Sequence, residues 1–152
     1  GIYDAMNKGL ARAGGAYVLF LNAGDQLASD DVLQRLSDLI TAQDNPDFIY
    51  GDALEETSDE ARPFMKRARD IRHLPQGMIT HHQAMVYKRE GLAGLRYDTG
   101  YSLAADYDLT LRFVRGLGKA GRSVYFSAPL CIFEAGGVSQ RQAGLARRQE
   151  FQ

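Results

Sequence analysis

The sequence predicts an α/β fold in which short buried strands alternate with amphipathic helices. The run 16–21 lies between two glycines and a polar segment, and it is too short and too continuously apolar for a surface helix. Residues 29–40 carry apolar side chains at helical spacing, and residues 47–52 form a second apolar run. Such a succession of helix, strand, helix and strand is typical of a layered α/β domain.

The first two elements are a helix and a strand. Residues 3–13 place Met6 and Leu10 on one helical face, and Gly14-Gly15 supplies a C-terminal stop. The following run, residues 16–21, is expected to be a central strand that runs parallel to its neighbours.

The second helix and strand follow. Ser29 is the expected cap of a helix with a regular apolar stripe: Val32, Leu33, Leu36, Leu39 and Ile40. Asn45-Pro46 breaks this helix, and residues 47–52 are expected to form a short strand that ends in the carboxylate of Asp52.

The segment 53–75 has a weaker pattern, in which an acidic run precedes a basic run that contains Lys66, Arg67, Arg69 and Arg72. A solvated loop or hairpin is favoured there over a phosphate-binding basic patch. The remaining expected elements are a strand at 82–87, a loop at 94–101 and a helix at 103–117 with Ser102 as its cap and Gly118 past its end. A strand is expected at 123–126, which residues 130–133 either continue or follow as a separate strand, and a polar helix at 140–152.

Size and charge limit the possible functions. The chain has 152 residues, the size of one domain, and a formal net charge of -1 with acidic and basic residues interspersed, which gives no footprint for wrapping nucleic acid. The single cysteine, Cys131, excludes an intrachain disulfide and fits a reducing compartment. We therefore expect a cytoplasmic location, with the inner face of the membrane as a peripheral alternative.

Asp25 is the first candidate for chemistry. A carboxylate at the carboxyl end of a strand in an open α/β sheet lies where ligands usually bind, and Gly24 beside it allows a phosphate to approach the backbone. A simple turn-capping aspartate is the alternative.

Asp106 is the second candidate, with Asp108 nearby. Two positions apart on a helix, their side chains point about 200° from each other, so only one can line a given pocket. The preceding loop favours Asp106, although stabilisation of the helix N-terminus is an alternative role for both carboxylates.

His82 is the third candidate. Adjacent residues on a strand face opposite ways, so we expect only one of His81 and His82 to enter a site. His82 would assist a metal or bind an anion, and a structural histidine is the competing interpretation. Cys131 is most simply a small buried residue.

Three ordered motifs resemble family 2 glycosyltransferases with the GT-A fold. The first comprises residues 1–9, 13–15 and 17–25, the last of which ends in Asn22-Ala23-Gly24-Asp25. The second is His82-Gln83-Ala84, and the third is the segment 105–112, which begins Ala105-Asp106. The resemblance extends to about Ser139 and is weakest from 53 to 75.

The resemblance implies an inverting transfer of a sugar from a nucleotide-diphospho-sugar to a hydroxyl of a saccharide or lipid-linked saccharide in polysaccharide or cell-surface glycan synthesis. It implies that Asp25 coordinates Mg²⁺ or Mn²⁺ and that Asp106 is the general base. The remaining implied contacts are Asn22, Gly24, Asp4 and Lys8 with the donor, and His82, Gln83 and Ser139 with the acceptor or diphosphate. Asn22 and Ala105 stand where the family motifs have carboxylates.

The resemblance also implies an N-terminally truncated, GT-A-like mixed sheet flanked by helices. Residues 1–152 would be one partial domain, with a metal-binding βα core at 1–52 and an acceptor-side half at 53–152. The absent N-terminal nucleotide-binding units would expose a sheet edge, from which we expect homo-oligomers. The alternatives are a truncated, catalytically silent module that oligomerises or binds sugar or metal weakly, and, less favoured, a Mg²⁺-dependent phosphohydrolase that uses Asp25.

Overall fold

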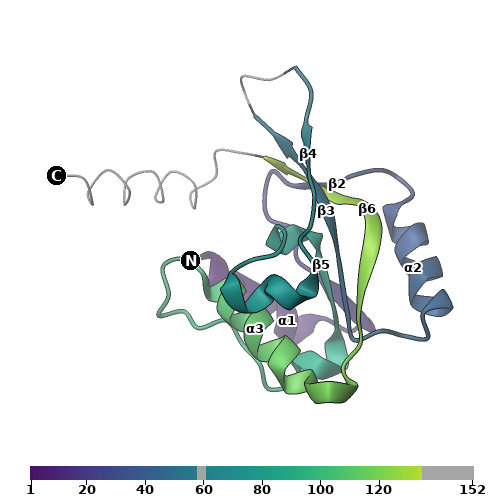
Figure 1. Cartoon of the computed structure of the whole chain (residues 1–152). Helices are drawn as coiled ribbons and strands as arrows, with labels where there is room; N and C mark the ends of the chain where they lie inside the picture. The colour runs from purple at the N-terminus through teal and green to yellow at the C-terminus, as the bar shows by residue number, and fades with distance from the viewer. Residues whose placement is uncertain (58–60, 135–152) are drawn as a thin grey trace.

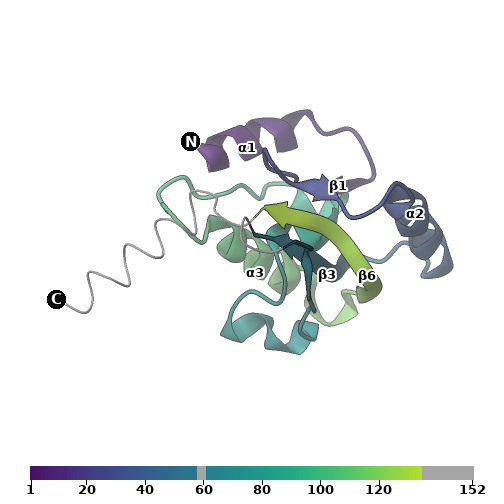
Figure 2. The same ribbon diagram turned by 90° about the horizontal axis from the view of Figure 1, so that it is seen from above.

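A computed structural model describes residues 1–57 and 61–134, and shows a curled mixed sheet with helices on both faces (Figures 1 and 2). The helices are α1 (Ile2–Arg12), α2 (Val32–Ala42) and α3 (Ala105–Leu117). The strands are β1 (Tyr17–Leu19), β2 (Gln26–Leu27), β3 (Phe48–Glu56), β4 (Phe64–Lys66), β5 (Met85–Lys88) and β6 (Ser123–Glu134). The α/β class and the mixed sheet are confirmed, whereas Ser139 and the expected helix at 140–152 lie outside the described residues.

The sheet is built around β3, with strand order β1-β5-β3-β6-β2 and with β4 paired to the outer half of β3. The β3–β6 pair is parallel, and the other pairs are antiparallel. The expectation of a central, parallel strand at 16–21 is wrong, because within the described residues β1 pairs only with β5, antiparallel, at the edge of the sheet. Groups packed above and below the sheet cover the apolar side chains of β1. An edge strand covered in this way is as apolar as a central strand, so composition alone did not reveal its position.

Two apolar cores lie on opposite faces of the sheet. The core under α1 and α3 includes Met6, Phe48, Tyr87, Leu109 and Phe113. The core under α2 includes Val32, Leu36, Ile49, Leu130 and Cys131. Because consecutive strand side chains alternate between faces, Phe48 and Ile49 contribute to different cores.

Both expected serine caps are wrong. The residue before α2 is Asp31, and the Ser29 hydroxyl donates to the Asp31 carboxylate at 2.5 Å instead of capping a backbone N–H. Helix α3 starts at Ala105 after a left-handed Ala104 (φ 68°), two residues later than Ser102 predicts. The predicted end at Gly118 is confirmed, and its positive φ of 64° is the conformation that glycine adopts most easily.

The segment after residue 52 begins as a hairpin, as favoured. Strand β3 continues to Glu56 and pairs with β4, so the strand expected at 47–52 is longer than predicted. Asp52 does not end this strand. It lies inside β3, at an irregularity in the β3–β6 register. The expected strand at 123–126 is confirmed, and residues 130–133 continue it, so that both runs belong to β6. In the described part of the chain, no helix is long and apolar enough to cross a membrane.

Candidate functional site

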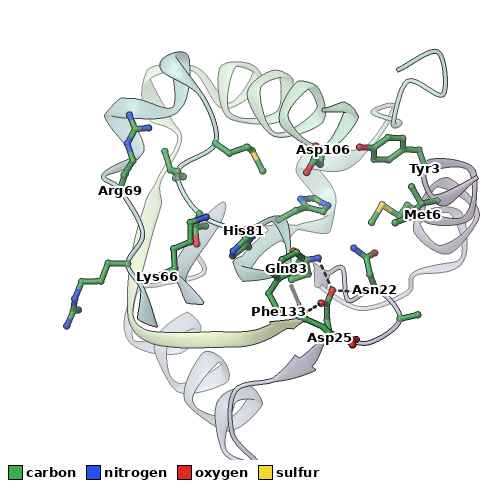
Figure 3. Close-up of a pocket in the computed structure, with 18 residues that line it drawn as sticks. Tyr3, Met6, Asn22, Asp25, Lys66, Arg69, His81, Gln83, Asp106 and Phe133 are labelled. Carbon is green, nitrogen blue, oxygen red and sulfur yellow. Dashed lines mark hydrogen bonds between the residues drawn. The ribbon is translucent and has the colours of Figure 1, made fainter. Parts of the chain in front are cut away.

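A pocket of about 440 Å³ opens beside the end of β6, between the start of α1 and the start of α3 (Figure 3). It brings together five of the predicted site residues: Asn22, Asp25, His82, Gln83 and Asp106. Asp4, Lys8 and Gly24 do not line this pocket, and Ser139 lies outside the described residues. Asp4 and Lys8 instead form an exposed ion pair of 2.7 Å on α1.

Asp25 is held in a tight turn after β1. Its backbone N–H donates to the Asn22 carbonyl at 3.1 Å, and its carboxylate accepts the Asn22 N–H at 3.3 Å. Gly24 has a φ of +95°, and the Glu134 carboxylate packs so closely on it that a Cβ would collide. This glycine therefore permits both the turn and the close approach of a second carboxylate.

Gln83 orients the Asp25 carboxylate directly. Its side-chain amide donates to Asp25 Oδ2 at 2.8 Å, and the Glu134 backbone N–H donates to Oδ1 at 3.4 Å (Figure 3). The resemblance implied a substrate contact for Gln83, and sequence reasoning missed its link to Asp25. Nothing in the linear spacing signals that link, because two distant segments make it.

The donor set around Asp25 fits a divalent cation only in part. Within residues 1–57 and 61–134, no group of three or more His, Cys, Asp or Glu side chains is arranged to hold a metal ion. Asp25 and Glu134 nevertheless both line the pocket, and Mg²⁺ is commonly bound by one or two carboxylates together with substrate phosphates. The residues thus fit an ion shared with a phosphate ligand.

His81, His82 and Gln83 all line the pocket, so the expectation that only one of the histidines enters is wrong. They do not lie on a strand: residues His82–Ala84 form a 3₁₀ turn, η2, and β5 starts at Met85. With three residues per turn, neighbouring side chains diverge by about 120° and can reach different walls of one pocket.

His82 is a buried, hydrogen-bonded residue. It is 5% exposed, stacks on Phe20 with ring centroids 5.3 Å apart, and places Nε2 2.6 Å from the Tyr97 hydroxyl and Nδ1 3.3 Å from the Tyr87 hydroxyl. Burial lowers the pKa of His82 to about 4, and the charge of Asp106 opposes this shift. The imidazole is therefore neutral at pH 7, which favours the structural interpretation.

A hydrogen-bond chain continues from His82 to the start of α3. The Tyr87 hydroxyl lies 2.7 Å from Thr110 Oγ1, which donates to the backbone carbonyl of Asp106 at 2.7 Å. Because Thr110 uses its proton on that carbonyl, Tyr87 must donate to Thr110. His82 Nδ1–H then donates to Tyr87, and Tyr97 donates to Nε2.

Asp106 and Asp108 separate as predicted. Asp106 lines the pocket, whereas Asp108 forms an ion pair of 2.7 Å with Arg112 and is absent from the pocket lining. Asp106 Oδ1 accepts the Tyr107 backbone N–H at 2.9 Å, and Tyr3 of α1 points toward this turn (Figure 3). Burial, followed by the negative charge of Asp106, raises the pKa of Tyr3.

A second charged cluster, formed by Glu55, Lys66 and His81, lies beside another wall of the pocket. Glu55 accepts from Lys66 at 3.0 Å and lies 2.5 Å from His81 Nε2, while the His81 ring stacks on Phe133 at 4.2 Å. Burial acts to raise the pKa of Glu55, but the hydrogen bonds from Lys66 and His81 leave it below its ordinary value. Burial lowers the pKa of His81.

No family model matches this sequence. The chain is similar to proteins named "PGL/p-HBAD biosynthesis glycosyltransferase" from Mycobacterium bovis and Mycobacterium tuberculosis, with 35% identity over 74% of this chain and 43% of theirs. It is also similar to a protein named "Uncharacterized glycosyltransferase" from Mycobacterium tuberculosis, with 26% identity over 93% of this chain and 53% of that one. The chain spans about half the length of these relatives, and most of its residues are thus similar to part of a glycosyltransferase.

Proposed function

We propose that this chain forms the metal-binding and acceptor-side part of an inverting, GT-A-like family 2 glycosyltransferase that uses a nucleotide-diphospho-sugar. The observation that carries the proposal is that Asp25, in the turn after β1, and Asp106, in the first turn of α3, line one pocket. The resemblance assigns these two carboxylates different tasks, and the relatives' names support sugar transfer in glycan synthesis.

Asp106 acts as the general base in this proposal. It removes the proton from the attacking acceptor hydroxyl, and a single displacement at the anomeric carbon inverts its configuration. Its place in the first turn of α3 keeps the carboxylate at the pocket wall, and the Thr110 bond to its carbonyl fixes that turn.

Asp25, aided by Glu134, is the proposed holder of Mg²⁺ or Mn²⁺. When bound, such an ion stabilises the negative charge that develops on the leaving nucleotide diphosphate. Asn22 offers an amide where the family motif has a carboxylate, and it can still accept and donate hydrogen bonds to the donor. Gly24, Asp4 and Lys8 remain proposed donor contacts from the resemblance.

The glycosyltransferase proposal also gives a proposed acceptor and a proposed cellular location. The acceptor is a saccharide or lipid-linked saccharide, and the buried thiol of Cys131 fits the reducing cytoplasm, with the inner membrane face as the alternative site of action.

Substitution of Asp106 tests the proposal. In the full-length transferase of which this chain is the proposed part, the Asp106→Asn variant is expected to lose at least about 99% of sugar transfer, because the amide cannot take the proton, while donor binding survives. Transfer is measured with a panel of nucleotide sugars and glycan acceptors, and donor binding by calorimetry. Asp108→Asn is the matched control, since that carboxylate pairs with Arg112 outside the pocket. Transfer retained in Asp106→Asn would remove Asp106 as the base.

A catalytically silent module is the second candidate, favoured by the amide at Asn22 and by the small carboxylate set near Asp25. Calorimetric titration of the chain with UDP-sugar, with and without Mn²⁺, separates the two candidates. Clear metal-dependent binding that Asp25→Asn abolishes contradicts the silent module. Clear binding that is indifferent to Mn²⁺ contradicts metal assistance by Asp25.

A further inference from the structure

The pocket has a basic wall that the proposed reaction does not use. Lys66, Arg67 and Arg69, from the end of β4 and the segment that follows, line the pocket. In Figure 3, Lys66 and Arg69 lie at one side of the pocket, and Asp25 and Asp106 lie at the other. Charges of opposite sign therefore face the two ends of the same space.

The backbone of this wall is anchored. The Ala68 N–H donates to Asp52 Oδ1 at 2.7 Å, and the Arg69 N–H donates to the Ile79 carbonyl at 2.8 Å. Asp52 is only 1% exposed, and the Tyr125 hydroxyl lies 2.9 Å from both of its carboxylate oxygens. A buried carboxylate in the centre of the sheet thus fixes the segment that carries the two arginines.

The two guanidinium groups retain binding capacity. Lys66 pairs with Glu55 at 3.0 Å, and Arg67 forms a longer ion pair of 3.6 Å with Asp52 while its side chain stays 79% exposed. Among the residues that the structure describes, no carboxylate forms an ion pair with Arg69. Planar, permanently charged guanidinium groups match the oxygen geometry of a phosphate group.

We infer that Arg67 and Arg69 bind a phosphate group on the acceptor. The inference rests on the proposed function, in which the donor diphosphate lies beside Asp25 and the acceptor hydroxyl lies beside Asp106. An acceptor that reaches from Asp106 to the basic wall then places its phosphate against the arginines. The substrate class is a phosphate ester, carried either by a soluble sugar or by a lipid.

Direct binding tests the inference without any transfer reaction. The full chain is titrated by calorimetry with glucose 1-phosphate and with farnesyl diphosphate without divalent cations, and with UDP in the presence of Mn²⁺, which would hold a diphosphate beside Asp25. The Arg67→Ala/Arg69→Ala double variant is expected to weaken binding of a phosphate ester at least about tenfold, because it removes charge-assisted hydrogen bonds. UDP binding should change less than threefold. The stronger of the first two ligands identifies a sugar or a lipid carrier.

The control variant is Arg115→Ala, which removes an exposed arginine of α3 that does not line the pocket. Circular dichroism checks folding, and Arg67→Gln/Arg69→Gln replaces the alanine variant if that one unfolds. Three results overturn the inference: no binding of either phosphate ester, an equal loss in Arg115→Ala, or an equal loss of UDP binding. Failure of Asp106→Asn to stop transfer overturns the proposed base and leaves this binding result intact.

Discussion

The buried side-chain amide of Gln83 fixes the position of the Asp25 carboxylate by a hydrogen bond. It is 5% exposed and donates to Asp25 Oδ2 at 2.8 Å, so it satisfies an anion without adding charge. Gln34 makes the same kind of bond to Asp38 at 2.9 Å on the exposed surface of α2. The two pairs differ mainly in solvent screening, which makes them a matched comparison.

The Gln83→Glu variant is expected to lose about 1–3 kcal/mol of unfolding free energy at pH 7.5, because two carboxylates then face each other in a partly buried site. The pKa of the introduced carboxyl is raised in the folded state, so the loss is greatest above its folded pKa. It disappears below the unfolded value of about 4.3. Urea unfolding of variant and parent at pH 7.5 and pH 4 measures this. Gln34→Glu should change stability by less than about 0.5 kcal/mol, and equal effects of the two variants would contradict the prediction.

His82 makes stability depend on pH in the opposite sense. Its folded pKa of about 4 lies below its ordinary value of 6.5, so the unfolded chain binds a proton first on acidification. The contribution of neutral His82 is complete above pH 6.5 and is lost as the pH falls toward 4, by about 3 kcal/mol in all. NMR titration of the imidazole carbons, with His82 assigned by its loss in His82→Gln, measures the folded pKa. A midpoint near 6.5 would refute the prediction.

At the scale of elements, α3 is held by a bond within its own first turns. Thr110 is fully buried and connects Asp106 to Tyr87 on β5. Thr41 on α2 makes the same i−4 bond to Ser37 at 3.1 Å, but on the surface.

Replacement of Thr110 by valine keeps the shape and removes the hydroxyl. We expect Thr110→Val to cost about 1–3 kcal/mol, because the Tyr87 hydroxyl loses its closest partner inside the core. Thr41→Val should stay within about 0.5 kcal/mol of the parent. Denaturant unfolding measures both, and a Thr110→Val protein as stable as Thr41→Val would show that the chain of hydroxyls is not a structural connection.

For the whole molecule, β1 lies at one edge of the sheet and β2 at the other end of the strand order. Arg89 N–H donates to the Ala16 carbonyl, and Val18 pairs with Tyr87, so alternation directs the Leu19 N–H away from β5. Such an edge can pair with a second copy of the chain.

Sedimentation velocity at increasing protein concentration is expected to show self-association that Leu19→Pro suppresses. Proline removes the outward N–H without breaking the β1–β5 ladder. Leu19→Ala, which keeps that N–H and removes most of the side chain, is the control and should associate like the parent. Identical association of both variants would exclude β1 as the interface.

The fold class was predictable because the spacing of apolar residues along the sequence indicates which side chains are buried. In the helices and in β3, the buried side chains have the spacing that such elements require. The position of β1 was not predictable, since an edge strand covered on its faces has the same composition as a central one. The place of Asp25 and Asp106 in one pocket was predictable from the order of the motifs and from helix geometry. The Gln83–Asp25 bond was not, because a long-range contact creates it. The basic run at 66–72 was visible in the sequence, and a phosphate-binding patch was the less favoured interpretation there, but its place on the pocket wall depends on long-range contacts. The proposed metal, base and donor roles remain predictions.

The turn His82–Ala84 has a consequence for protein engineering. One of its residues is tied to the helix of Asp106 through tyrosine and threonine hydroxyls, and its neighbour is bonded to Asp25. Inserting or deleting a single residue there would misalign both carboxylates together, whereas exchanging the turn as an intact cassette would preserve them. Libraries that vary this pocket should therefore treat positions 82 and 83 as one linked unit.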